Sequence, residues 1–226
     1  MHEAASGSSL RAELLGAIDD YQSHWQSVDT ELYDLCRRRA HQSFADVYAK
    51  VVVINRVYAA GISRSSRAQG DRESEVARGL VSLGPALEER LTRLRTASEL
   101  DAATAADVVE VHDFLVRGLL PFTGDTWQTS FGSKYLHFHW NLVPIFDDRA
   151  GSAIRRVLMK HGVSPMRVET SKPQTWVTAY RNFVEQFLAL YESLREGEPE
   201  SNCQMLWTRS HAAAPSSVPS SLLSRS

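Results

Sequence analysis

Cysteine is scarce in this chain of 226 residues, with only Cys36 and Cys203 far apart in the sequence. Two such distant cysteines provide neither a disulfide framework nor the closely spaced pairs of a zinc site, and they favour a reducing compartment. Long apolar runs are also missing, because the longest strongly apolar stretch covers only residues 51–54. A membrane-spanning helix needs roughly 20 apolar residues, so we predict no membrane span.

Several targeting and catalytic motifs are absent as well. The opening residues lack the basic segment and apolar stretch of a secretion signal, so we expect a cytoplasmic protein. The chain has no glycine-rich phosphate-binding loop, no H-E-x-x-H motif and no G-x-S-x-G motif. These absences exclude the P-loop, dinucleotide-binding, zinc-hydrolase and serine-hydrolase classes that the motifs define, and we expect no cofactor.

Two histidines, His137 and His139, precede two aspartates, Asp147 and Asp148, and this combination raises the possibility of a metal site. Residues two positions apart on a helix point about 160° away from each other. The two histidines therefore cannot chelate one ion, and no third histidine lies at a useful spacing. We expect no bound metal.

Basic residues are segregated within a chain whose net charge is only −2. Between 149 and 168 there are five basic side chains and no acidic one. They are Arg149, Arg155, Arg156, Lys160 and Arg167. Such a segment suits contacts with phosphates, and we take the first four as expected DNA-backbone contacts. The alternative is a solvated helix face.

Apolar residues recur mostly at helical spacing, and convincing alternating strand patterns are missing. The pattern predicts about nine helices, at 10–26, from a cap at Asp29 onward, and at 43–60, 71–83, 85–98, 104–120, 130–140, 148–161 and 173–195. Pro85 is expected in the first turn of its helix, where its missing N–H does no harm. Tyr21 and Trp25 are expected to face inward from the first helix.

These helices are expected to pack into a single domain. The chain length suits one core, and 43% hydrophobic with 23% charged residues is ordinary globular composition. We therefore predict an all-α, multi-helix domain over residues 9–197. The Ser-, Pro- and Ala-rich sequence at the end predicts a disordered tail at 198–226.

Most of the residues suited to chemistry lie in the segment 129–149. On a helical wheel of about 100° per residue, the helix in this segment shows two neighbouring stripes. The apolar stripe contains Phe131, Tyr135, Phe138 and Leu142, and the polar stripe contains Lys134, His137 and Asn141. The polar stripe predicts one wall of a pocket, in which His137 and Asn141 contact the substrate.

Lys134 and Asp147 are the candidate catalytic residues. We expect Lys134 in the first turn of its helix, where the helix dipole and burial favour the neutral amine of a nucleophile. The alternative is an ordinary solvent-facing lysine. Asp147 is expected to cap the next helix, with Asp148 as the other choice, while its carboxylate also faces positive charge on a substrate.

Stacking on a nucleobase is a further possibility for the tryptophans Trp25, Trp127, Trp140 and Trp176. Trp127 is the best candidate because it lies in the loop before the lysine-bearing helix. Core packing is the alternative, since it is the commoner role of tryptophan in helical proteins.

The order of these residues resembles the helix-hairpin-helix DNA glycosylase superfamily. Ser-Phe-Gly-Ser-Lys at 130–134 and Val-Pro-Ile-Phe-Asp-Asp-Arg at 143–149 are similar to the family's lysine-bearing helix and the turn that delivers an aspartate. The likeness is greatest to the 8-oxoguanine DNA glycosylase branch, and to bacterial proteins of that fold, some encoded near anti-phage defence genes. The chain has one hairpin glycine, Gly132, where the family has two.

The resemblance implies a helix-hairpin-helix fold and an enzyme that excises a damaged or modified base from DNA. Lys134 is then the amine that attacks the sugar C1′, and Asp147 is the carboxylate that stabilises the positively charged transition state. Gly132 and Ser133 offer backbone N–H groups to phosphates, and Asp148 contacts the substrate.

Three hypotheses follow from the sequence. The first is a DNA glycosylase, with or without strand-cleaving lyase activity, in DNA repair or anti-phage defence. The second is a non-catalytic module of the same fold that binds nucleic acid or a nucleotide. The third is a purely structural interaction protein.

Overall fold

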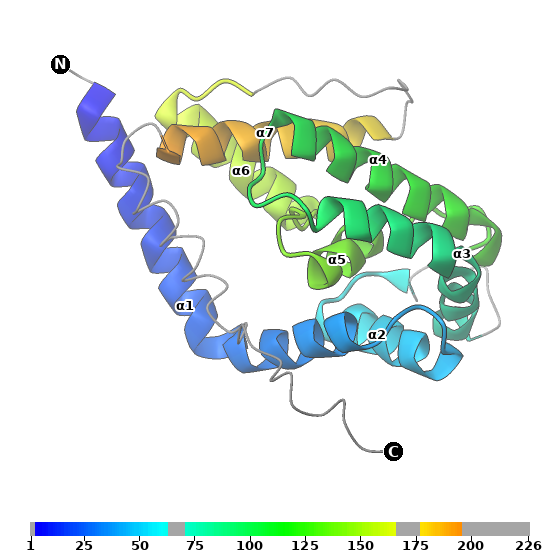
Figure 1. The fold of residues 1–226 in the computed structure, drawn as a ribbon. Coiled ribbons are helices and arrows are strands. Elements are labelled where there is room, and N and C mark those ends of the chain that lie inside the picture. Colours follow the sequence, from blue (N-terminus) through cyan, green and yellow to red (C-terminus); the bar gives the residue numbers. More distant parts are fainter. Residues whose placement is uncertain (1–2, 63–70, 166–176, 196–226) are drawn as a thin grey trace, which may run out of the picture.

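The computed structural model describes residues 3–62, 71–165 and 177–195 (Figure 1). α-Helices account for 78% of these residues, and no strand occurs within the three ranges. The predicted all-α, multi-helix domain is confirmed. The tail expected at 198–226 lies outside the described residues.

One helix lies at the centre of the arrangement. The described elements are α1 (Glu3–Arg38), α2 (Phe44–Val57), α3 (Arg72–Leu94), α4 (Ala102–Leu119), the short 3-10 helix η2 (Leu120–Phe122), α5 (Thr129–His139), α6 (Asp148–His161) and α7 (Val177–Arg195). The short helix α5 contacts α1, α2 and α4, and Figure 1 shows it surrounded by longer helices. The first part of α1 extends along one side of the molecule.

Local sequence signals set several helix ends as expected. The side chains of Ser43 and Asp147 accept backbone N–H groups at the starts of α2 and α6. Gly162 ends α6 with a φ of 68°, in the left-handed region that glycine adopts without strain. The bounds of α5 differ by one residue at each end from the expected 130–140.

The expected break between a helix at 10–26 and another after Asp29 is wrong, because α1 is continuous. The Asp29 carboxylate does not cap a helix. It accepts the hydroxyl of Tyr21 (2.6 Å) and that of Tyr58, at the C-terminal end of α2. Tyr21 and Trp25, expected to face inward, are 45% and 38% exposed. A tertiary contact has taken the place of the local cap.

The expected division into helices at 71–83 and 85–98 is also wrong, because α3 passes through Pro85 without a break. Proline removes one backbone hydrogen-bond donor from the helix. Leu80 and Leu87 are completely buried on either side of it, and their packing offsets the loss. Because α1 and α3 are each continuous, the described ranges contain seven α-helices instead of about nine.

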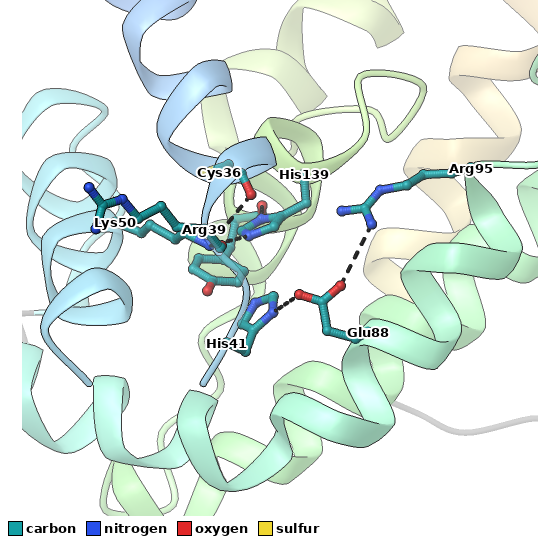
Figure 2. A network of polar contacts seen from close by, with 8 residues as sticks. Cys36, Arg39, His41, Lys50, Glu88, Arg95 and His139 are labelled. Atoms are coloured by element: carbon teal, nitrogen blue, oxygen red, sulfur yellow. Dashed lines mark hydrogen bonds and ion pairs between the residues drawn. The ribbon is translucent and has the colours of Figure 1, made fainter. Parts of the chain in front are cut away.

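The buried ammonium group of Lys50 ties α1, α2 and α5 together (Figure 2). Its Nζ donates to the carbonyl oxygens of Arg39 and of Cys36 (3.5 Å), and to Nε2 of His139 (3.2 Å). Three N–H groups thus meet three acceptors, and the cation sits at the C-terminal end of α1, where the helix dipole favours it. Burial lowers the pKa of Lys50.

The histidine that accepts from Lys50 is itself held in its neutral form. His139 Nδ1 donates to the carbonyl oxygen of Tyr135 (2.7 Å), so Nε2 is the acceptor. Complete burial keeps the pKa of His139 well below its usual value. The His41 ring stacks on His139 at 4.8 Å and bonds to Glu88 of α3 (2.6 Å), as Figure 2 shows. The network therefore reaches a fourth helix.

Replacing Lys50 tests how much this network contributes. Lys50→Met keeps a long apolar stem but leaves two carbonyls and His139 without their donor, so we expect a loss of about 3 kcal/mol in unfolding free energy. Urea unfolding followed by circular dichroism measures it. The matched control is Lys160→Met, at an exposed site on α6, with an expected change within about 0.5 kcal/mol. Equal effects of the two substitutions would contradict the assignment.

Candidate functional site

Lys134 and Asp147 are in direct contact. The Lys134 Nζ lies 3.2 Å from Asp147 Oδ2 and donates to the backbone carbonyl of Tyr58 at 2.8 Å. Lys134 is only 5% exposed, so the alternative of a solvent-facing lysine is wrong. Because α5 begins at Thr129, the lysine lies in the second turn and not in the expected first turn.

Asp147 has two roles at once. Its Oδ1 accepts the Ala150 N–H at 2.9 Å as the N-cap of α6, while Oδ2 faces Lys134. Partial burial by itself raises the pKa of Asp147, but the Ala150 N–H and the Lys134 ammonium outweigh it, so the pKa lies below its usual value. The Asp147 side chain is 35% exposed. The carboxylate therefore connects the buried amine to solvent.

The chain returns from α5 to α6 in a short segment held by side chains of α5. The Ser133 Oγ accepts the Phe146 N–H at 3.0 Å, and His137 Nδ1 donates to the carbonyl of Val143 at 2.7 Å. Because α5 ends at His139, few residues are needed to bring the start of α6 back to the middle of α5. The proximity of lysine and aspartate follows from this early helix end.

The burial of Gly132 and Ser133 argues against their expected contacts with phosphates. A Cβ at Gly132 would lie 2.7 Å from Cγ2 of Val116, so the glycine allows α5 to pack closely against α4. Ser133 is completely buried, and its hydroxyl is engaged with the backbone of Phe146. Both residues serve packing and chain reversal.

The expected substrate-contacting residues are not all on one stripe. Asn141 lies in the turn after α5, because the helix ends before reaching it. His137 remains on α5, and its Nε2 accepts the Tyr33 hydroxyl. Asp148 is exposed in the first turn of α6, and Trp127 is 41% exposed, which excludes core packing for that tryptophan.

The basic residues of α6 form a surface that begins beside the Lys134–Asp147 pair. All four expected DNA-backbone residues are exposed, namely Arg149, Arg155, Arg156 and Lys160. At 3.6 residues per turn, Arg149, Arg156 and Lys160 fall on one face of the helix. Arg167 lies outside the described residues.

Sequence reasoning offered Trp25 among the stacking candidates but missed the group of residues around it. Tyr21, Trp25 and Asp29 follow one another at four-residue spacing along α1. The Trp25 and Tyr58 ring centroids are 5.9 Å apart, and the Tyr58 carbonyl binds Lys134. The four-residue spacing is visible in the sequence, but it equally suits a core-facing stripe, and only the exposure of Tyr21 and Trp25 distinguishes the two.

Within residues 3–62, 71–165 and 177–195, no three histidine, cysteine or acidic side chains are grouped so that they could bind a metal ion. None of the helices described there combines the length and apolar character needed to cross a membrane. Comparisons with protein-family models, curated proteins and solved structures give no match to this chain. The chemical interpretation therefore depends on the geometry and on the resemblance of the sequence segments.

The chemistry available to the pair is nucleophilic attack assisted by a carboxylate. An amine that attacks carbon must first lose its proton, and a carboxylate in contact with it can take that proton. The same carboxylate, fixed by its helix cap, can then offset positive charge on the carbon under attack.

Two substitutions separate the cap from the ion pair at Asp147. Asp147→Asn keeps an oxygen for the Ala150 N–H but removes the charge, and we expect it to cost about 1–2 kcal/mol because the Lys134 ammonium loses its partner. Asp147→Ala removes the cap as well and should cost about 1 kcal/mol more. Urea unfolding at neutral pH measures both losses. If the two variants unfold at the same urea concentration, the side chain does not cap α6.

Proposed function

We propose that this chain is a DNA glycosylase of the helix-hairpin-helix type that excises a damaged or modified base, with Lys134 as the nucleophile and Asp147 as the assisting carboxylate. The observation that carries the proposal is the 3.2 Å contact between Lys134 Nζ and Asp147 Oδ2. The sequence resemblance had assigned these two residues to one catalytic pair. Their contact, shielded from water on the lysine side, supports that assignment.

The proposed reaction begins when the neutral amine of Lys134 donates its electron pair to C1′ of the sugar and the N-glycosidic bond breaks. The departing base keeps the bonding electrons and takes up a proton. The new amino group then loses a proton, its nitrogen lone pair expels the ring oxygen, which is protonated, and an imine forms. Elimination from that imine permits strand cleavage.

Asp147 has two tasks in this scheme. It accepts the proton that Lys134 must lose, and its 35% exposed side chain can pass the proton to solvent. It also offsets the positive charge that develops on the sugar as the base departs. The cap to Ala150 holds the carboxylate in place for both tasks.

The charges around the pair favour one orientation of the DNA. The basic face of α6 begins at Arg149, two residues after Asp147, and suits the sugar-phosphate backbone. On α1, Asp19 and Asp20 are exposed and would repel phosphates. We therefore place the phosphates on the α6 side and the flipped base on the α1 side.

Borohydride trapping tests the catalytic proposal. The probes are duplex and single-stranded DNA that carry a panel of damaged or modified bases, and the readout is a covalent protein–DNA adduct. We expect an adduct with the natural chain and none with Lys134→Gln, while Asp147→Asn should form it roughly a hundredfold more slowly.

Lys134→Arg is the matched control, because it keeps a cation beside Asp147 but cannot form an imine. It should bind DNA without forming the adduct. An adduct that persists in both Lys134 variants would assign the chemistry to another amine. Binding by the natural chain without any adduct would contradict catalysis.

The role of the basic face is tested by the salt dependence of DNA binding. Arg156→Gln should reduce the slope of log affinity against log salt concentration by roughly 1, because one phosphate contact is lost. Fluorescence anisotropy at several salt concentrations measures the slope. Arg93→Gln, at a 57% exposed side chain on α3, is the control and should leave the slope unchanged. An unchanged slope in Arg156→Gln would remove α6 from the DNA interface.

A second candidate function, a non-catalytic module that binds nucleic acid or a nucleotide, has its own support. The Lys134 amine is nearly buried and bonds to two acceptors, as a purely structural lysine would. Tight binding without an adduct in the trapping experiment would favour this function.

A further inference from the structure

The middle of α1 exposes two large aromatic side chains, Tyr21 and Trp25. Trp25 is 38% exposed and Tyr21 is 45% exposed, although both are large rings with apolar faces. The two side chains lie about one helical turn apart on the same face of α1. The ring centroids of Trp25 and Tyr58 are 5.9 Å apart, with an interplanar angle of 41°. One side of Trp25 is thus supported by protein while part of the ring remains open to a ligand.

The polar group on this face of α1 is the carboxylate of Asp29. Asp29 accepts hydroxyl groups from Tyr21 (2.6 Å) and from Tyr58, one at each oxygen. An ionised carboxylate offers about four acceptor positions. Two of them therefore remain beyond the bonds to the two tyrosines, on a residue that is partly exposed.

This face is connected to the candidate catalytic lysine through one residue. Tyr58 packs against Trp25 with its ring and accepts the Lys134 amine with its backbone carbonyl, at 2.8 Å. The Tyr58 ring also packs against Phe138 of α5 at 4.8 Å. Tyr58 is therefore the single residue that links Trp25 to the Lys134 amine.

We propose that Trp25, supported by Tyr58, is the stacking surface for the unpaired nucleobase, and that Asp29 accepts an amino or ring N–H group from that base's edge. The assignment rests on the proposed function, because it names the base-binding part of the same site. A flipped base is held by stacking on aromatic rings and by hydrogen bonds to its exposed edge, and this face supplies both. Fully paired DNA hides the stacking faces and the Watson–Crick edge of every base and does not fit the surface.

Binding to matched duplexes tests the stacking role. The probes are fluorescein-labelled duplexes with one adenine opposite an abasic site, and the same duplexes fully paired. Trp25→Ala should weaken binding to the unpaired-base duplex about 5- to 100-fold and leave binding to the paired duplex unchanged. Trp25→Phe should retain most of the affinity. Phe44→Ala, at a 41% exposed ring on α2, is the control and should have no effect.

The proposed hydrogen bond to Asp29 is tested by removing one amino group from the base. Replacing the adenine by unsubstituted purine removes the exocyclic amino group and keeps the stacking surface, so the natural chain should bind it more weakly. Asp29→Asn should reduce this difference in affinity between adenine and purine.

If Trp25→Ala loses its helical circular dichroism signal, Trp25→Gln is used in its place, because glutamine suits a helix and lacks a ring.

The outcomes separate this inference from the proposed function when the same variants are also trapped with borohydride. Unchanged affinity and unchanged trapping in Trp25→Ala would overturn the stacking surface and leave catalysis standing. A loss of affinity for the unpaired base in Trp25→Ala, in a chain that never forms an adduct, would support the surface and overturn catalysis. Equal losses for paired and unpaired duplexes would overturn the surface.

Discussion

The buried Lys50 ammonium is the interaction on which the rest of the structure depends. It binds two carbonyls at the end of α1 and a ring nitrogen of α5, and thereby holds three helices around one charge. A buried charge that loses its partners is strongly destabilising, so other relative placements of these helices are disfavoured. The same three helices carry most of the candidate site: Trp25 and Asp29 on α1, Tyr58 at the end of α2 and Lys134 on α5. Asp147, at the start of α6, completes it. The network thus helps to position the part of the site that α1, α2 and α5 carry.

Within the site, Asp147 and Tyr58 each stabilise the fold and also position a group of the candidate site. Asp147 caps α6 and pairs with Lys134, while Tyr58 fixes Asp29 with its hydroxyl and Lys134 with its carbonyl. Each of these contacts restricts the position of a group that the proposed reaction needs. Contacts of this kind hold the side chains in fixed positions relative to one another before any substrate binds.

Much of the fold could be predicted from local sequence because helix periodicity and capping act within a few residues. The Ser43 and Asp147 caps and the Gly162 stop are of this kind, and the structure has them. The two wrong breaks, at Asp29 and at Pro85, have a common cause. At each point a local stop signal competes with long-range contacts, the tyrosine hydroxyls at Asp29 and the buried leucines beside Pro85, and the long-range contacts are stronger.

For the site, the sequence alone determined which residue types were present and the order of lysine, turn and aspartate that makes their contact possible. Only the tertiary structure decided that α5 ends early enough for Lys134 and Asp147 to meet, that Ser133 is used in the chain reversal, and that Trp25 remains exposed. The physical reason is that exposure and pairing depend on which neighbours fill the space around a side chain. Residues far away in the sequence supply those neighbours, and no local pattern records them.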